Sequence, residues 1–242
     1  MLRKSIRGAL ALLLALVGVA MEGPVPAVEQ PSSLAKTVLE PFVERGEIAG
    51  AVVMIVSASR VLEYDAVGYA DLSTRRAMPK DAIFWIASTS KPFVSAAVMM
   101  MVEEGRIHLD DPVRKYLPDF QPDVALNPES PGTTAVRPTN RPVTIRMLLN
   151  HSSGMYGGSP ADAPTLDAVP LAQRVVSYAK LLQFELGTRF VYGNADVNTA
   201  AYIVEVVSGV PFDLFLETRL LRPLGMNECQ RLTTSQATEL AR

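Results

Sequence analysis

Residues 92–104 carry apolar side chains around nearly the whole circumference of a helix, and this feature limits the fold more than any other in the sequence. A helical period places one apolar stripe at Phe93, Ala96, Ala97, Met100 and Met101. Val94 and Val98 are apolar as well, so the helix is expected to be buried on nearly all sides. Gly105 follows where a glycine commonly ends a helix. With 242 residues, the chain is long enough for one domain with a substantial core.

A second apolar segment, residues 51–56, is continuous and is bounded by Gly50 and four polar or small residues. This pattern predicts a strand that is buried on both faces, with residues 61–68 as its hairpin partner. Further helical patterns occupy residues 144–149, 171–182 and 198–207, and Thr144 is a candidate cap for the first of them. Because the strand signals come early and the helices follow, the sequence predicts an α+β fold, with an antiparallel sheet flanked by helices.

Residues 121–142 are rich in proline and in small polar residues. The prolines are Pro122, Pro128, Pro131, Pro138 and Pro142. This composition predicts a long surface loop. Loops of this length are uncommon in compact domains and are often functional.

The N-terminus has the pattern of a secretory signal peptide. Arg3, Lys4 and Arg7 precede an uncharged apolar run over residues 8–20, and small residues follow at two plausible cleavage points. We therefore expect residues 1–27 to be a signal peptide and cleavage region, and residues 28–242 to be the domain. The protein is expected to be secreted or periplasmic. The alternative is an uncleaved N-terminal anchor, which would be its one link to a membrane.

Composition narrows the classes of function. Lys and Arg number 23 against 25 Asp and Glu, a net charge of −2 that gives no reason to expect a nucleic-acid partner. Two histidines, His108 and His151, are too few for us to expect a metal cluster, and the single Cys229 permits no disulfide framework within the chain. No cofactor is expected. The expected partner is a small-molecule or peptide substrate, and the sequence leaves the oligomeric state open.

The tetrad Ser88-Thr89-Ser90-Lys91 is the first candidate for catalysis. Residues three apart on a helical turn lie on one face, so the Lys91 amine can reach the Ser88 hydroxyl. A serine hydroxyl needs an adjacent base, and a lysine serves as one when its pKa is depressed. Pro92 disfavours helical geometry at the residue before it, which predicts a tight turn entering the helix. The alternative is an ordinary surface serine and lysine at a helix cap, because four-residue patterns of this kind often arise by chance.

The second candidate is Tyr192-Gly193-Asn194. A tyrosine beside a cation loses its proton more easily and can act as a general base or proton relay. The Asn194 amide can donate to a substrate carbonyl and hold a lysine. The alternative is a loop tyrosine beside a turn-forming asparagine. A Ser-His-Asp triad would instead need His151 or His108.

Several segments in order resemble the class C β-lactamase-like and penicillin-binding-protein-like serine hydrolase superfamily. The resemblance starts near Ile48 and rests on residues 68–71, 84–93, 103–105, 109–112, 145–155, 192–194, 208–209 and 223–226. It implies that Ser88 attacks an amide, β-lactam or ester carbonyl and becomes acylated, while Lys91 helps to remove its proton. It further implies that Tyr192 relays protons, that Asn194 contacts the acyl side chain, and that His151 is a structural loop residue. The implied fold adds a helical subdomain to the sheet.

The superfamily also has a third motif, K-T-G or H-x-G, on a strand beside the nucleophile. Residues 195–242 contain neither pattern and no lysine or histidine. The resemblance therefore leads us to expect a partial, C-terminally truncated domain, whose fold is incomplete at the C-terminus. The alternative to a serine hydrolase is a catalytically inactive fragment or a binding paralogue.

Overall fold

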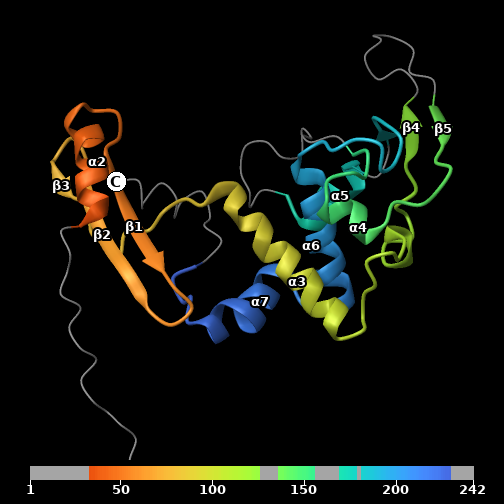
Figure 1. Ribbon diagram of the computed structural model, residues 1–242. Coiled ribbons are helices and arrows are strands. Elements are labelled where there is room, and N and C mark those ends of the chain that lie inside the picture. The colour runs from red at the N-terminus through yellow and green to blue at the C-terminus, as the bar shows by residue number, and fades with distance from the viewer. Residues whose placement is uncertain (1–32, 126–135, 156–168, 179–180, 230–242) are drawn as a thin grey trace, which may run out of the picture. The chain divides into compact units, whose positions relative to one another are not determined.

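The computed structural model describes residues 33–125, 136–155, 169–178 and 181–229. The expected signal segment, residues 1–27, lies outside the described residues. The chain divides into two compact units, Met1–Ile83 and Phe84–Arg242. Each unit is an assembly of its own, and together their helices and antiparallel strands make the protein α+β (Figure 1).

The first unit is a helix on a three-stranded antiparallel sheet in the order β1-β2-β3 (Figure 1). Its elements are α2 (Leu34–Glu44), β1 (Gly50–Val56), β2 (Val61–Asp71) and β3 (Arg76–Ala77). The hairpin register sets Gly50 opposite Gly68 and Val56 opposite Val61, which confirms the expected partner of residues 51–56. Ser33 caps α2, because its hydroxyl accepts a hydrogen bond from the backbone N–H of Lys36.

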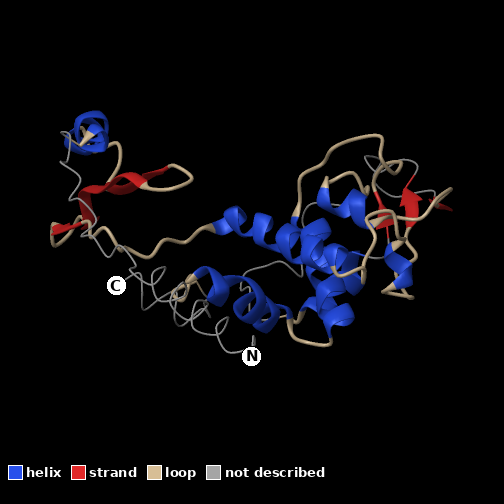
Figure 2. Ribbon diagram, turned by 60° about the horizontal axis from the view of Figure 1, so that its bottom comes forward, coloured by secondary structure: helices blue, strands red, loops and turns tan. Residues whose placement is uncertain are grey.

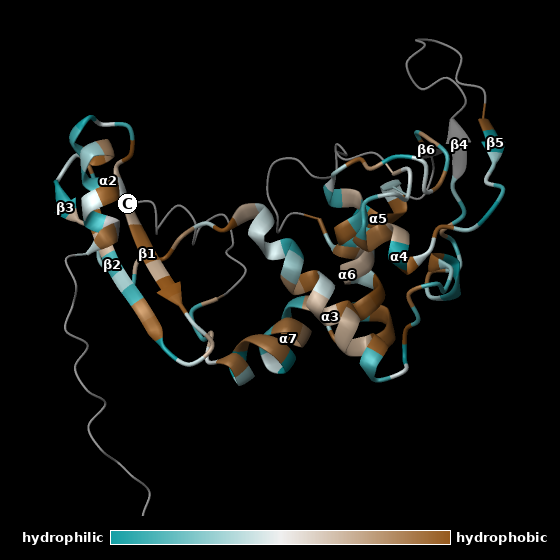
Figure 3. Cartoon of the chain, viewed as in Figure 1, coloured by the Kyte–Doolittle hydropathy of each residue, from teal (hydrophilic) through white to brown (hydrophobic). Residues whose placement is uncertain are grey.

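Strand β1 differs from the expectation in its burial. Its first four residues are half-buried, and the last three, Met54, Ile55 and Val56, are 55%, 40% and 60% exposed. Within the described residues β1 pairs along one edge with β2, and α2 packs mainly against β2. The prediction of a strand buried on both faces was therefore wrong for the described part of the unit. The brown colour of β1 in Figure 3 shows that its exposed end is apolar.

The second unit is helical and is organised around α6 (Asn194–Ser208), which packs against α3, α4, α5 and α7 (Figures 1 and 2). The other helical elements are η1 (Ala87–Ser90), α3 (Lys91–Glu103), η2 (Val113–Lys115), α4 (Ile145–Leu149), α5 (Leu171–Tyr178), α7 (Phe212–Leu216), η4 (Glu217–Leu221) and η5 (Arg222–Leu224). The hydroxyl of Thr144 caps α4 by accepting from the N–H of Met147, as expected. The helix predicted for residues 198–207 begins four residues earlier, at Asn194.

A small mixed sheet in the order β5-β4-β6 completes the second unit. Strand β4 (Asp123–Ala125) runs antiparallel to β5 (Val136–Pro138) and parallel to β6 (Leu181–Leu182). Two predictions need correction here, because residues 121–142 contain two strands and the helix predicted over residues 171–182 ends at Tyr178. Strands this short pair with residues far away in the sequence, so they leave little local periodicity for a prediction to use.

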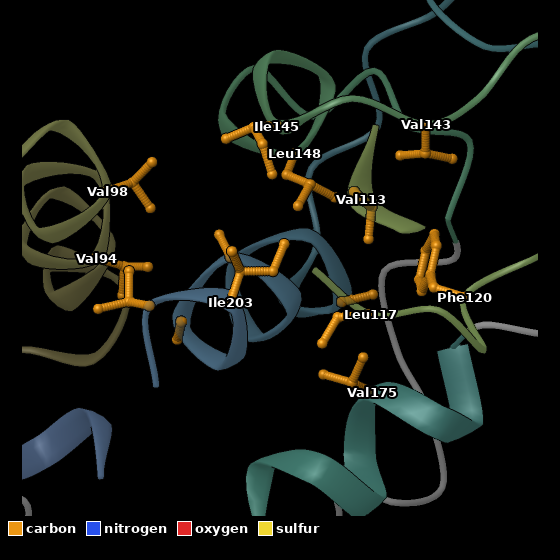
Figure 4. Close-up of a cluster of buried hydrophobic side chains, with 14 of the residues drawn as sticks. Val94, Val98, Val113, Leu117, Phe120, Val143, Ile145, Leu148, Val175 and Ile203 are labelled. Atoms are coloured by element: carbon orange, nitrogen blue, oxygen red, sulfur yellow. The ribbon is translucent and has the colours of Figure 1, made fainter. Parts of the chain in front are cut away.

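The core of the second unit surrounds α6 and extends from α3 to α4, α5 and the segment of Val113 and Phe120 (Figure 4). The buried residues of α3 are Val94, Ala97, Val98 and Met101, whereas the predicted stripe also held Phe93, Ala96 and Met100. The stripe is rotated because α6 packs against that side, and Figure 4 shows Ile203 of α6 near Val94 and Val98. The helix is thus buried on one face rather than on nearly all sides.

Among the described residues, no single helix is long and apolar enough to cross a membrane. Helix α6 together with residues 212–224 reaches the required length and composition only as a pair that is bent by 79°.

Candidate active site

The S-x-x-K tetrad forms the turn that enters α3. Residues Ala87–Ser90 make one 3-10 turn, and Lys91 continues it in helical geometry with φ −62° and ψ −39°. Pro92 then stands in the first turn of α3, where its missing N–H breaks no helical hydrogen bond. The expected tight turn is present at Ala87–Ser90, but Lys91 itself adopts the helical geometry that Pro92 was expected to disfavour. Ala87 has φ 42°, a left-handed conformation that is strained for an alanine and directly precedes Ser88.

Within this turn, Lys91 reaches Ser88. The Nζ atom of Lys91 donates a hydrogen bond to Oγ of Ser88 over 3.0 Å. The three-residue spacing on a helical turn accounts for this contact. Ser88 is exposed and Lys91 is half-buried, so the hydroxyl is open to an incoming molecule while the amine is held beside it.

Tyr192 joins the same group from the segment that precedes α6. The Nζ atom of Lys91 lies 4.8 Å from the centroid of the Tyr192 ring, within the range of a cation–π interaction. A hydrogen bond with Ser88, and next a hydrogen bond with Lys91, lower the pKa of the Tyr192 hydroxyl below its ordinary value of 10.0. The structure thus brings Ser88, Lys91 and Tyr192 together, and their catalytic roles stay predictions.

Asn194 is placed differently. It is the first residue of α6, and its side chain is exposed. Within the described part of the chain, its side chain makes no hydrogen bond with Ser88, Lys91 or Tyr192. Its predicted contact with the acyl side chain stays a prediction.

A pocket of about 290 Å³ opens at the three residues. Its polar lining comes from Ser88, Lys91, Ser95, His151 and Tyr192. Its apolar lining comes from Pro92, Val94, Leu149 and Val197, which belong to α3, α4 and α6. The pocket thus combines an exposed serine hydroxyl with an apolar wall.

His151 lies in the loop after α4 and borders this pocket. Its Nδ1 atom is 3.1 Å from Oδ2 of Asp196, and its ring centroid is 4.9 Å from that of Tyr192 and 5.7 Å from that of Phe190. Among the described residues, the Ser88 hydroxyl accepts a hydrogen bond from Lys91, and no hydrogen bond joins it to His151. The geometry of a Ser-His-Asp triad is therefore not formed.

Backbone hydrogen bonds tie the His151 loop to the segment that leads to Tyr192. The N–H groups of Gln183, Gly187 and Val191 donate to the carbonyls of Gly154, Ser152 and His151, over 2.8, 2.8 and 3.0 Å. Gly154 has φ +82°, and a Cβ atom there would lie 2.6 Å from the carbonyl oxygen of Phe184. The close approach of the two segments thus depends on a glycine at this position.

Sequence reasoning missed Asp196, although its carboxyl group is part of the site. It is 2% exposed, and the hydroxyl of Ser153 donates a hydrogen bond to its Oδ1 atom. Burial is the largest influence on its pKa and raises it, while His151 and Ser153 act in the opposite direction. A signal was available: Asp196 shares the helical stripe of Thr199, Ala200 and Ile203, and an acid on a buried stripe requires polar partners.

The fold of the described residues resembles that of solved structures of the β-lactamase and penicillin-binding-protein class. Residues 35–236 match the family model described as Beta-lactamase, so the chain belongs to the beta-lactamase family. It is similar to esterase EstB of Burkholderia gladioli, with 30% identity over 197 residues that cover 75% of this chain and 47% of EstB. The chain spans about half the length of the curated relatives it matches.

Two solved structures are similar as well. EstCE1, a hydrolase with promiscuous acyltransferase activity, has a TM-score of 0.67 and 29% identity, and the match covers 79% of this chain and 50% of EstCE1. The octameric penicillin-binding protein homologue from Pyrococcus abyssi has a TM-score of 0.62 and 28% identity, and the match covers 79% of this chain and 42% of the homologue. Both likenesses support the α+β fold of this family.

Proposed function

We propose that this chain carries the nucleophile and the proton-transfer groups of a serine acyl hydrolase that acts through an acyl-enzyme. The observation that carries the proposal is the hydrogen bond of 3.0 Å between Nζ of Lys91 and Oγ of Ser88, beside the ring of Tyr192. The substrate class is an ester, an amide or a β-lactam. EstB, named an esterase, and the penicillin-binding protein homologue of Pyrococcus abyssi support this range.

The chemistry follows from the contacts of Ser88. Its Oγ attacks the substrate carbonyl carbon, while its proton passes to the Lys91 amine or the Tyr192 phenolate. Collapse of the tetrahedral intermediate expels the alcohol or amine, which takes up the proton from Ser88 through Tyr192, and leaves Ser88 acylated. Water then attacks the acyl carbon and gives a proton to the same base, which returns that proton to Oγ of Ser88 as the carboxylic acid leaves. A lowered pKa suits Tyr192 to this exchange, because a proton relay works best with a pKa near the working pH.

We also propose that the protein is secreted or periplasmic. The basic residues Arg3, Lys4 and Arg7 before the apolar run of residues 8–20 support export. N-terminal sequencing of the protein recovered from an export-competent bacterial host would test this. A mature N-terminus near residue 21 or 28 is expected, and an intact Met1 would contradict cleavage.

Labelling with a fluorophosphonate probe tests the nucleophile. The wild-type chain is expected to react, and Ser88→Ala is expected to lose the label while its circular dichroism spectrum is unchanged. Ser90→Ala is the matched control, since Ser90 is in the same turn but its hydroxyl donates to the carbonyl of Ala87. A label that survives in Ser88→Ala would place the nucleophile elsewhere. A folded wild-type chain without any label would favour the alternative, an inactive fragment or binding paralogue.

A further inference from the structure

We propose that Ser153, Asp196 and His151 form a buried chain of contacts that positions the ring of Tyr192, which makes His151 a positioning residue for acyl transfer. The proposal rests on the proposed function in one respect, because it assumes that Tyr192 moves the proton. It is carried by three contacts: Ser153 to Asp196, Asp196 to His151, and His151 to Tyr192.

The first residue in this series of contacts, Ser153, is held firmly in place. Ser153 is fully buried, and its Oγ atom both donates to Asp196 and accepts the backbone N–H of Met155 over 3.0 Å. Asp196 is in the first turn of α6, where the helix dipole favours a negative charge. The Ser153 hydroxyl and the N-terminus of α6 therefore both stabilise the Asp196 carboxyl group, in addition to its contact with His151.

Asp196 in turn fixes the imidazole of His151. Nδ1 of His151 lies 3.1 Å from Oδ2 of Asp196, and an ionised carboxylate at this position would accept a hydrogen bond from the imidazole. A carboxylate that is hydrogen-bonded to one ring nitrogen sets both the tautomer and the orientation of a histidine ring. The backbone of His151 is fixed as well. Its φ angle is 56°, and its carbonyl accepts a hydrogen bond from the N–H of Val191. The side chain of His151 is 11% exposed, which leaves it little freedom to turn.

The fixed imidazole supports a tyrosine that is otherwise exposed. Tyr192 is 52% exposed, and a side chain in that state samples several rotamers unless neighbours restrict it. His151 packs on its ring at 4.9 Å between centroids, with an angle of 51° between the planes. Among the described residues, the charged or titratable groups around this contact are Asp196 on the far side of His151, and Lys91 beside Tyr192. The hydroxyl of Tyr192 stays close to Ser88 only while the ring is held.

Two variants separate the ring contact from the anchor. His151→Asn keeps an N–H donor for Asp196, suits the left-handed backbone, and removes the aromatic contact. His151→Phe keeps an aromatic ring and removes the donor. Two measurements apply to each variant of the full chain: the rate of labelling by a fluorophosphonate, and the titration of Tyr192 followed by NMR of ¹³Cζ-labelled tyrosine. Tyr192→Phe assigns the resonance, and thermal melts report the fold.

We expect His151→Asn to melt near the wild-type temperature and to label about 10- to 100-fold more slowly, since a misplacement of about 1 Å has such an effect on a reacting group. Its Tyr192 resonance should titrate at higher pH than in the wild type, because the contacts with Ser88 and Lys91 are loosened. We expect His151→Phe to melt at a lower temperature, because Asp196 loses a partner.

The outcomes discriminate clearly. Wild-type labelling and wild-type Tyr192 titration in His151→Asn would overturn the inference and leave the proposed function intact. Abolished labelling with an unchanged Tyr192 titration would also overturn it, because His151 would then act directly as the base. If the wild-type chain is not labelled while the Tyr192 titration still moves in His151→Asn, the positioning role stands and the proposed function fails.

Discussion

The Nζ atom of Lys91 lies 4.8 Å from the centroid of the Tyr192 ring. Lys91 begins α3, and Tyr192 lies two residues before α6, so the contact joins two motifs that are far apart in the sequence. It exists because α3 and α6 pack against each other in one unit. The same helix pair therefore contributes to the core and brings Lys91 beside Tyr192.

Replacing Lys91 tests its part in acylation. Lys91→Met keeps the aliphatic stem without the amine. Lys91→Arg places a guanidinium there, which stays protonated and cannot act as a base. Both are expected to slow Ser88 labelling by about 100-fold or more, the scale for losing a general base. The time course of fluorophosphonate labelling measures the effect. Lys36→Met is the control, since Lys36 is an exposed partner of Asp65. A near-normal rate in Lys91→Met would show that its contact with Ser88 is incidental.

The pH dependence of labelling reports on Tyr192. Its pKa is lowered from 10.0, chiefly by its hydrogen bond with Ser88. If the phenolate helps to remove the Ser88 proton, the rate should rise with pH through a pKa below 10.0 and then level off. Tyr192→Phe should remove this rise. Rates measured across the alkaline range decide the matter, and an unchanged profile in Tyr192→Phe would assign the rise to another group.

Asp111 is expected to contribute to stability in a manner that depends on pH. Lys115 and Tyr116 donate to its carboxylate, which lowers the pKa of Asp111 from 3.8 to about 2. A lowered pKa means that the contribution is complete above pH 3.8 and is lost as the pH falls towards 2. Asp111→Asn should therefore melt below the wild type at neutral pH, and the difference should shrink in acid.

Asp110→Asn is the matched control for that experiment. Asp110 forms an ion pair with Arg146, but its side chain is 79% exposed. Exposed pairs of this kind contribute little to stability, because water screens the two charges. Thermal melts at neutral and acid pH should thus show a smaller effect for Asp110→Asn than for Asp111→Asn, and equal effects would contradict the assignment.

Gly154→Ala should destabilise the loop that carries His151. Its left-handed backbone costs an alanine about 1–2 kcal/mol, and the new Cβ would lie 2.6 Å from the Phe184 carbonyl oxygen. Gly209→Ala has the same backbone strain, with φ +75°, but nothing within 4 Å of the new atom. Urea unfolding should show a larger loss for Gly154→Ala by about 1–3 kcal/mol, the scale of overpacking. Equal losses would mean that the Phe184 segment moves aside.

The sequence was most informative where the periodicity was long. It predicted α3 and α6, since each runs for 13 or 15 residues, and it predicted the hairpin of β1 and β2 from two adjacent runs. It failed for β4 and β6, which are two or three residues long and pair across the chain. It predicted the buried face of α3 only in part, with Ala97 and Met101 in common, because a helix that is apolar all round does not show which side meets α6.

The sequence predicted the contacts of the candidate site only where the residues are close together in the chain. Ser88 and Lys91 are neighbours on one turn, so their contact follows from spacing alone. Asp196 has no such local partner, because Ser153 and His151 reach it from the loop after α4. Its role depends on tertiary packing, which the sequence indicates only through the odd position of an acid on an apolar stripe.

The bond between His151 and Asp196 also constrains how this chain can change over evolutionary time. A mutation that removes His151 leaves an acid in the interior with one fewer hydrogen bond, and a mutation that removes Asp196 frees the imidazole to adopt either tautomer. Losing both residues avoids a buried carboxyl group that lacks its imidazole partner, but it does not restore the ring contact of His151 with Tyr192. Descendants of this sequence are therefore expected to inherit or to lose the two residues jointly.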